Sequence, residues 1–485
     1  MLEFAIVGAG FSGIAMARAL TRAGVHDFKV YEKAAAVGGT WRENHYPGAA
    51  CDVPSHLYSL ADAPNARWTR LFPRQPEIQA HLLSLGDELI ATGKIEFAWR
   101  LRSAHWDAEQ RCWCLTNAAG QQIRARTMVL ALGGLHVPAF PDIPGKEQFA
   151  GSVFHSAQWR HDVDLSGRRV AVIGTGASAI QFVPIIAPLA AHLSVFQRSA
   201  PWLMPRPDFL FPAWVRSAFA RLPFAAQMLR GSIFLLLELL STGLTHRRFG
   251  GWARWLAQTH LHKQVADADL RARLMPDYPI GCKRVLISSD YYPALTRANV
   301  QLIDEPISAI ESNGLRMQSG QLIEADVLIY GSGFKPMDVL ADIEIIGSHG
   351  RNLANDWQTR PQAYLGISVH GYPNLHFLLG PNTALGHNSV LYMIDSQVRH
   401  IMALQRAKRD RNTLSAEPTA AAQTAFLQDV DAGFPNSAWA GGCRSWYLDT
   451  QGHNIALWTK SCLAYRWLTR RVNAADYHFD PQQLR

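Results

Sequence analysis

The stretch that decides the fold is Glu3-Phe-Ala-Ile-Val-Gly8-Ala-Gly10-Phe-Ser-Gly13-Ile-Ala-Met-Ala. A short apolar strand runs into Gly-x-Gly-x-x-Gly, and a helical pattern continues to about Ala23. In such a unit one glycine makes the tight turn, one lets the backbone approach a pyrophosphate, and one packs helix against strand. The next expected strand, 28–31, ends in Glu32, 19 residues after Gly13. A carboxylate there accepts hydrogen bonds from ribose hydroxyls and repels a 2′-phosphate, which predicts a site for a dinucleotide such as FAD.

A second segment repeats this pattern. A strand over 169–173 leads into Gly174-Thr-Gly176-Ala-Ser178-Ala179, where alanine takes the third glycine position. A helix follows to about Ala190, and the next strand, 193–196, leads to Arg198, 19 residues after Ala179. A guanidinium in this position suits a 2′-phosphate by charge and by geometry, so the second unit should hold NADPH in preference to NADH.

Two different dinucleotide sites in one chain imply a flavoprotein that takes hydride from NADPH. The flavin half must be completed further along the chain. Residues 127–134 and 323–334 each read as a strand that ends in a glycine turn. We expect both strands to return to the flavin sheet, with backbone close to the cofactor.

Composition narrows the class of protein. The chain has 485 residues, 48% of hydrophobic type and 18% charged, which is typical of a globular protein of about three domains. Its formal charge of +8 suits phosphate-bearing ligands but is weak support for nucleic acid. We therefore expect no nucleic-acid partner.

The cysteines and apolar runs bear on the compartment. Six scattered cysteines are too few for a disulfide framework, and no Cys-x-x-Cys pair offers a zinc ribbon or a redox dithiol. Cys112 and Cys114 straddle Trp113 in an expected strand and are interpreted as core thiols. The N-terminus lacks a basic region typical of a signal peptide, and the most apolar run, 233–240, contains Glu238. We expect a soluble cytoplasmic protein.

Beyond Glu32, several motifs occur together. They are Gly38-Gly39-Thr40-Trp41 followed by Tyr46-Pro47-Gly48 and Asp52; Phe149-x-Gly151-x-x-x-His155-x-x-x-Trp159; Cys282-Lys283-Arg284; Gly380-Pro381-Asn382-Thr383 with Gly386-His387-Asn388-Ser389; and Gly441-Gly442-Cys443-Arg444-Ser445-Trp446-Tyr447. In this order they resemble the Baeyer–Villiger monooxygenases, class B flavoprotein monooxygenases, over nearly the whole chain. Arg160 departs from the family pattern, which has Pro or Asp after the tryptophan.

The resemblance implies an α/β fold of two Rossmann-like dinucleotide-binding domains, for FAD and NADPH, with a helical insertion. It implies oxygen insertion beside a ketone carbonyl, through a C4a-peroxyflavin, to give an ester or lactone. Arg284 matches the family's catalytic arginine, and Asp52 matches the carboxylate that positions it. Gly39, Thr40 and Trp41 match the flavin-binding stretch. Lys283 matches a second 2′-phosphate contact, Trp446 an aromatic that closes over the cofactor and substrate, and His155 a structural residue.

We expect the flavin domain to cover 1–145 and 328–485, the NADPH domain 146–208 and 276–327, and the insertion 209–275. The insertion should form a buried helical subdomain, although Arg230, Arg247 and Arg248 with nearby aromatics also suit a membrane surface. Membrane contact is not expected, and the chain should be a monomer or a weak homo-oligomer.

Three alternatives compete. Flavin monooxygenases that oxidise nitrogen or sulfur need no clamping arginine, which Arg284 and Asp52 argue against. A flavin disulfide reductase needs a cysteine pair, and Cys51 has no partner cysteine nearby in sequence. A non-catalytic nucleotide sensor would leave the Arg284–Asp52 pair idle. The expected substrates are therefore a small-molecule ketone and dioxygen.

Overall fold

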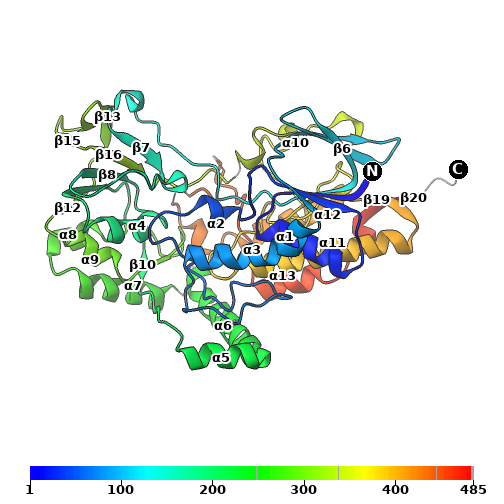
Figure 1. Cartoon of the computed structure of the whole chain (residues 1–485), viewed down its shortest axis with the longest axis horizontal. Coiled ribbons are helices and arrows are strands. Elements are labelled where there is room, and N and C mark those ends of the chain that lie inside the picture. The colour runs from blue at the N-terminus through cyan, green and yellow to red at the C-terminus, as the bar shows by residue number, and fades with distance from the viewer. Residues whose placement is uncertain (247–249, 337, 444, 450, 482–485) are drawn as a thin grey trace.

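The computed structural model describes residues 1–246, 250–336, 338–443, 445–449 and 451–481. Arg247, Arg248 and Arg444, which the motifs and the insertion included, lie outside these residues. Two sheet units, one mixed and one wholly parallel, stand at opposite ends of the long axis of the molecule (Figure 1). This confirms an α/β architecture with two nucleotide-type units.

The larger sheet is built around the N-terminal strand. Its order is β17-β4-β5-β6-β1-β2-β3, and β18 also pairs with β6. The strands are β1 (Leu2–Val7), β2 (Phe28–Tyr31), β3 (Ile95–Glu96), β4 (Leu101–Asp107), β5 (Cys112–Asn117), β6 (Gln122–Leu130), β17 (Glu344–Ile346) and β18 (Leu375–Phe377). The strand expected within 127–134 is the end of β6, which pairs with β1 in parallel, so its expected return to the flavin sheet is confirmed.

Helices cover one face of this sheet and fill its core. Ile6 and Val30 from the strands share a buried cluster with Ile14 of α1 (Phe11–Arg22), Leu82 of α3 (Gln75–Ala91) and Ile394 of α11 (Val390–Asp410). The remaining elements of this half are α2 (Thr40–Glu43), α10 (Leu353–Asp356), α12 (Ala420–Gly433), α13 (Cys462–Thr469), β19 (Thr413–Pro418) and β20 (Tyr477–Pro481).

The smaller sheet is wholly parallel, with the order β12-β9-β8-β16-β7. Its strands are β7 (Ser152–His155), β8 (Arg169–Ile173), β9 (His192–Phe196), β12 (Val300–Ile303) and β16 (Val327–Tyr330). The elements around it are α4 (Ala179–Ile186), α7 (Gly251–Gln264), α8 (Ala268–Arg273), α9 (Tyr291–Leu295), β10 (Leu203–Met204), β11 (Leu286–Ile287) and the antiparallel β13 (Ile307–Glu311), β14 (Gly314–Met317) and β15 (Leu322–Glu324).

The position of β16 corrects one expectation. We expected residues 323–334 to return to the flavin sheet, but β16 pairs in parallel with β8 and β7. The strand was correctly located, whereas its sheet was wrong. Val327 pairs with Val170 and Ser152, 157 and 175 residues away, and local sequence does not specify such distant partners. The chain therefore crosses back to the larger sheet only after Tyr330.

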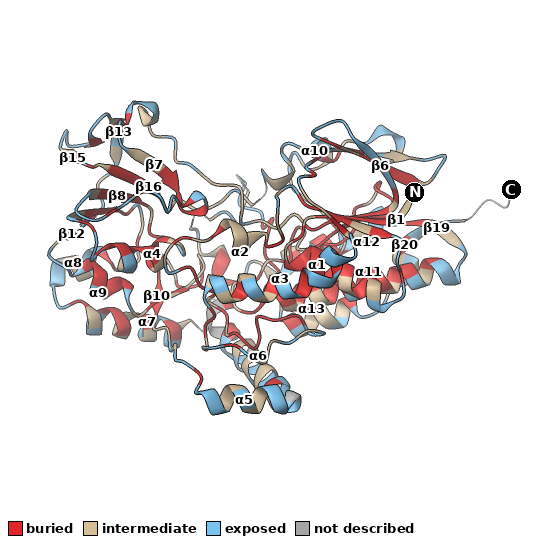
Figure 2. Ribbon diagram, in the orientation of Figure 1, coloured by how far each residue is buried: buried red, intermediate tan, exposed pale blue. Residues whose placement is uncertain are grey.

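The helical insertion is also different from the expectation of a buried subdomain. Two helices of the expected insertion 209–275, α5 (Ala213–Arg221) and α6 (Pro223–Thr245), project from the body of the molecule, and much of their surface is exposed (Figure 2). Ile233, Phe234 and Leu237 pack against the core of the larger unit, but no residue of α5 is buried. The expectation of burial was wrong for α5 and the outer side of α6, because helical spacing of apolar residues does not show whether other elements cover them. Residues 251–264, in the same expected insertion, form a helix with four buried residues.

The cysteines differ from expectation in two respects. Cys112 is buried and Cys114 half-buried on β5, so only the first lies fully in the core. Cys282 and Cys443, 161 residues apart, form a disulfide that scattered sequence positions did not predict.

Candidate active site

The first glycine loop packs closely against neighbouring segments of the protein backbone. Gly8 has a φ of +108°, and a Cβ there would lie 2.4 Å from the carbonyl oxygen of Ala131, just after β6. A Cβ on Gly13 would lie 1.8 Å from the Gly8 oxygen, so helix α1 can pack only with glycine there. Gly10 faces Gly39, where an added Cβ would lie 3.0 Å from the Gly10 Cα. These two loops meet backbone to backbone, as a cradle for a pyrophosphate requires.

The Glu32 carboxylate binds the backbone of the first glycine loop. The carboxylate is buried at the end of β2, where Oε2 accepts a hydrogen bond from the Ala9 N–H at 2.8 Å and Oε1 from the Ala34 N–H at 2.9 Å. Oε1 also receives a longer contact from Nη1 of Arg42 at 3.4 Å, whereas Oε2 can accept a further hydrogen bond. The position and remaining acceptor capacity therefore fit a ribose diol beside the pyrophosphate cradle.

The segment after Gly39 is fixed by side-chain contacts. Helix α2 begins at Thr40, and Trp41 donates from Nε1 to the Tyr58 hydroxyl at 2.9 Å. Gln75, at the start of α3, donates to the Trp41 carbonyl at 2.5 Å. Hydrogen bonds therefore hold the expected flavin-binding stretch in place beside the first glycine loop. The residues present there fit FAD.

The second glycine loop repeats the first. Gly174 has a φ of +111°, and a Cβ there would lie 2.4 Å from the carbonyl oxygen of Gly331, just after β16. Gly176 follows in the loop, and Ser178 stands at the N-cap of α4 without a side-chain bond to that helix. The free N-terminus of α4 and the open glycine backbone suit a second pyrophosphate.

Two cations stand beyond this loop. Arg198 is exposed just after β9, and Lys283 donates from Nζ to the Ser199 hydroxyl at 2.9 Å. Partial burial lowers the pKa of Lys283, and the nearby positive charge of Arg198 lowers it further. Two cations held close together form a site for a multiply charged anion, and the 2′-phosphate of NADPH fits it.

Arg284 and Asp52 meet where the two units join. Nε of Arg284 donates to Oδ2 of Asp52 at 2.9 Å, Nη2 donates to the same oxygen at 2.7 Å, and Nη1 donates to the Leu385 carbonyl at 3.2 Å. The Asp52 charge raises the pKa of Arg284 further above its already high value. The two side chains remain 32% and 28% exposed, so the guanidinium is a fixed cation with an accessible side.

The C-terminal segment approaches this cation. Tyr447 is buried, and its pKa is raised mainly by burial while the charge of Arg284 opposes the rise. The Trp446 ring lies 4.3 Å from the Tyr447 ring but is 46% exposed. The disulfide between Cys282 and Cys443 ties the loop of Arg284 to this same segment. The expected closing aromatic therefore stands at the edge of the site.

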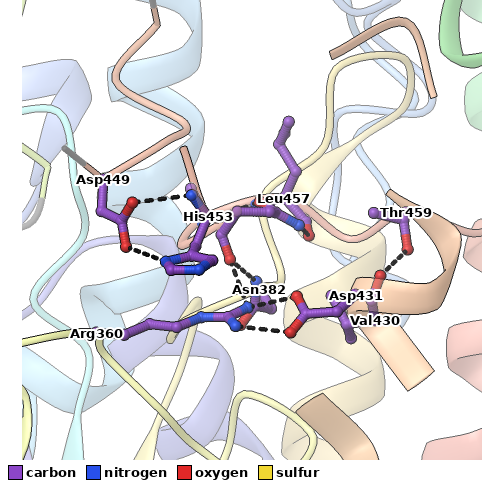
Figure 3. Close-up of polar contacts among 10 residues, drawn as sticks. Arg360, Asn382, Val430, Asp431, Asp449, His453, Leu457 and Thr459 are labelled. Carbon is purple, nitrogen blue, oxygen red and sulfur yellow. Dashed lines mark hydrogen bonds and ion pairs between the residues drawn. The ribbon is translucent and has the colours of Figure 1, made fainter. Parts of the chain in front are cut away.

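A polar network fixes the chain that follows Trp446. Figure 3 shows Arg360 making two ion-pair contacts with Asp431 of α12, each at 2.7 Å, and donating to the Asn454 carbonyl at 2.8 Å. Asn382, from the Gly380–Thr383 motif, donates to the same carbonyl at 2.9 Å. His453 contacts Asp449 at 3.0 Å in the adjoining turn. The network anchors the C-terminal segment to the larger unit.

Comparison with known proteins agrees with this geometry. A family model for an NAD(P)-binding Rossmann-like domain matches residues 6–74, and one for flavin-binding monooxygenase-like proteins matches 116–230. A Baeyer–Villiger monooxygenase of Pseudomonas aeruginosa is 44% identical over 99% of this chain and 92% of its own length. One of Streptomyces coelicolor is 40% identical over 98% and 92%. The chain belongs to the Baeyer–Villiger monooxygenases.

Solved structures support the same assignment for the whole chain. A steroid monooxygenase bound to NADP is 28% identical, with a TM-score of 0.89, and 99% of each chain is covered. A structure named OTEMO, complexed with FAD and NADP, is 25% identical, with a TM-score of 0.87 and the same coverage. This monooxygenase is therefore an enzyme that depends on FAD and NADPH and inserts one oxygen atom of O2 beside a ketone carbonyl.

The alternatives are weaker on the same observations. Cys51, the cysteine nearest the glycine cradle in sequence, is a buried free thiol whose pKa is raised by burial, so it does not suit disulfide reduction. His155 is buried between the rings of Phe140 and Phe334, and burial lowers its pKa to about 4. His155 is therefore neutral near pH 7 and packs as part of the structure.

Sequence reasoning missed one residue that joins the two units of this monooxygenase. The Gln181 side chain, on α4, accepts hydrogen bonds from the Tyr46 hydroxyl at 3.0 Å and the Ala50 N–H at 3.2 Å, and donates to the Ala50 carbonyl at 3.0 Å. Gly48 lies so close to α4 that a Cβ would be 2.6 Å from the Gln181 carbonyl. These contacts hold the segment that leads to Asp52. In the sequence, the signal for this close packing of the loop against α4 was the glycine of the Tyr-Pro-Gly motif.

Proposed function

We propose that Arg284 is the catalytic residue of this monooxygenase and that Asp52 positions it. The observation that carries the proposal is the pair of hydrogen bonds from Nε and Nη2 to one oxygen of Asp52. A third bond, to the Leu385 carbonyl, leaves the guanidinium little freedom to rotate. A cation held in place before reaction stabilises developing negative charge without reorganisation.

FAD, reduced by NADPH, supplies the activation of dioxygen in this family. Arg284 stabilises negative charge on the attacking oxygen and on the carbonyl oxygen of the ketone as the carbonyl carbon becomes tetrahedral. Because Asp52 raises the pKa of Arg284, the guanidinium keeps its proton at working pH. It therefore acts by electrostatic stabilisation and not as a proton donor.

The cofactor contacts are proposed residue by residue. For FAD they are Gly8, Gly10, Gly13, Glu32, Gly39, Thr40, Trp41 and Asp52, and for NADPH Gly174, Gly176, Ser178, Arg198 and Lys283. Trp446 is proposed to cover the cofactor and substrate from the edge of the site, which requires its exposed ring to move inward when the site is filled.

We propose a small-molecule ketone as substrate and an ester or lactone as product, with oxidation of sulfur as a side activity. A monomer or weak homo-oligomer in the cytoplasm is the proposed state. The proposed domain division keeps the limits 145, 208 and 275 but moves the last one from 327 to beyond Tyr330, because β16 belongs to the NADPH sheet.

Arg284→Ala tests the catalytic role. We expect the variant to bind flavin and to be reduced by NADPH, yet to form ester at least about 100-fold more slowly than the wild type. Stopped-flow absorbance measures flavin reduction, and mass spectrometry with labelled dioxygen measures the ester. Arg160→Ala is the matched control, since Arg160 is an exposed arginine paired with Asp162. Normal ester formation by Arg284→Ala would remove the arginine from its proposed role, and products confined to N-oxides or sulfoxides across a ketone panel would contradict the reaction itself.

A further inference from the structure

The outward face of α6 reverses the usual pattern of a surface helix. Phe224, Met228, Leu235 and Leu239 follow one another at spacings of four, seven and four residues, which places them on one side of the helix. All four are exposed; Phe224 is 71% and Leu239 67% exposed. Among the residues of α6 whose exposure is described, the other exposed polar or small ones on this side are the uncharged Gln227, Gly231 and Ser232. A helix that faces water normally places charged residues there.

Two helices that contact α6 also carry exposed tryptophans. Trp214 of α5 is 74% exposed, and Trp467 of α13 is 64% exposed. Helix α13 lies beside α6, because the Glu238 carboxylate accepts a hydrogen bond from the Cys462 N–H at 3.0 Å. We call the six residues Trp214, Phe224, Met228, Leu235, Leu239 and Trp467 the apolar face. Figure 2 shows α5 and α6 at the margin of the molecule, away from both sheets.

Charge accompanies this face. Residues 209–266 contain seven lysines and arginines but one acidic residue, Glu238, so this segment carries most of the surplus of +8. Glu238 points inward, where it also accepts a hydrogen bond from Asn388 at 2.8 Å. At the end of α13 the Arg470 guanidinium lies over the Trp467 ring at 5.2 Å, next to the exposed Arg471. Exposed leucines and tryptophans, on elements that also carry the exposed cations Arg221, Arg470 and Arg471, complement the surface of an anionic lipid bilayer.

The inward face shows how α6 would meet a bilayer. Phe234 stacks on Tyr392 of α11 at 4.6 Å, and Arg230 donates to the Ser59 carbonyl at 2.6 Å. By length and composition α6 could cross a membrane, but these contacts hold one side of it against the protein. A helix of 23 residues, about 34 Å long, can therefore present its other side to a membrane while lying along it.

We propose that the apolar face docks this monooxygenase onto the surface of an anionic phospholipid bilayer, with α6 in the plane of the interface. This replaces the expectation that the chain makes no membrane contact. The proposal does not depend on the reaction at Arg284, because the apolar face contains none of the residues proposed to bind cofactor or substrate. It also gives a ligand to exposed cations such as Arg221, which the 2′-phosphate site does not use.

Flotation of the FAD-loaded enzyme with vesicles tests the proposal. We expect the wild type to float with vesicles of phosphatidylcholine containing about 30% phosphatidylglycerol, and more weakly with phosphatidylcholine alone. Raising the salt concentration should reduce binding to the anionic vesicles. The double variant Leu235→Glu/Leu239→Glu should lower the partition coefficient at least about tenfold. It should keep its flavin and its ketone activity in solution, which shows that it is folded.

Leu189→Glu is the matched control, because Leu189 is an exposed leucine of the other unit, 49% accessible, and should leave flotation unchanged. Failure of the wild type to float with either vesicle would overturn the proposal. So would equal losses for the control and the double variant. If sedimentation shows a wild-type dimer that the double variant breaks, and vesicles bind neither protein, the face is instead an interface between two copies of the chain.

Discussion

Arg284 and Asp52 lie 232 residues apart in the sequence, and both Nε and Nη2 of the arginine donate to a single oxygen of the aspartate, at 2.9 and 2.7 Å. The contact joins the loop before β11 to the loop that follows the flavin-binding stretch. Gln181 supports the second loop from α4. The orientation of the cation therefore depends on how the two domains are docked.

Replacing the partner of Arg284 should separate position from charge. In Asp52→Asn the guanidinium keeps its charge but loses the anion that orients it, so we expect ester formation to fall about 10- to 100-fold. Flavin reduction by NADPH should change much less than ester formation, because we assign the pair to the oxygen-transfer step and the other FAD contacts are unchanged. Single-turnover ester yield and stopped-flow reduction are the measurements. Asp429→Asn, at an exposed ion pair with Lys460, is the control. Equal losses in both steps would mean that Asp52 is needed for the structure of the whole site.

The cation pair at the second cradle should set the preference for NADPH. Arg198→Ala and Lys283→Ala should each narrow the preference for NADPH over NADH by roughly 1–3 kcal/mol, since charge-assisted hydrogen bonds to the phosphate are lost. The ratio of kcat/KM for the two cofactors measures this change. In both variants, kcat/KM with NADH should stay near the wild-type value. Arg168→Ala, which changes an exposed arginine of the same domain, is the control and should keep the wild-type ratio of kcat/KM for NADPH and NADH. An unchanged ratio in both variants would show that other residues read the phosphate.

The disulfide between Cys282 and Cys443 predicts a defined number of free thiols. The unfolded, unreduced protein should show the four thiols of Cys51, Cys112, Cys114 and Cys462, and reduction should expose all six. Cys443→Ser should lower the free energy of unfolding by roughly 2–4 kcal/mol, because it removes a cross-link between segments 161 residues apart. Thiol titration and denaturant unfolding are the measurements. Cys114→Ser should not change stability much, and six thiols without reductant would refute the cross-link.

Buried Lys408 predicts a rise in stability with pH. Its ammonium donates to the Asn374 side-chain oxygen at 2.9 Å, and burial lowers its pKa to about 7. The unfolded chain keeps this proton up to about pH 10.4, so between about pH 7 and 10 it binds more protons than the folded state. The folded state therefore gains stability as pH rises through this window and gains none below it.

The variant Lys408→Met lacks this titration. From pH 7 to pH 9 the wild type should gain about 1–3 kcal/mol of unfolding free energy relative to the variant. Urea unfolding of both proteins at the two pH values gives the difference, in which other titrating groups cancel. A difference that does not change with pH would show that Lys408 is not neutralised in the folded state.

Some features could be predicted from the sequence because they depend on residues that are close together along the chain. The two glycine loops and the acid or cation that follows each strand were predicted because a strand, a tight turn and a helix constrain neighbouring residues. β2 and β8 have the bounds expected from sequence. The family motifs placed Arg284 and Asp52 in one site because their order along the chain is that of the family, although no local rule joins them.

Other features depend on segments that meet only in the folded chain. Gly8 contacts Ala131 after β6, and Gly174 contacts Gly331 after β16. The two glycine loops therefore pack against equivalent segments, each just after a strand of its own sheet. Sequence alone placed β16 in the wrong sheet, because parallel partners are set by packing over long separations. It also predicted burial for the insertion, and it did not pair Cys282 with Cys443. The amino-acid sequence by itself determined the two dinucleotide units and the chemistry of their ligands. The tertiary structure alone decided the sheet of β16, the disulfide and the exposed face of α6, because burial and contact depend on what the rest of the chain places alongside.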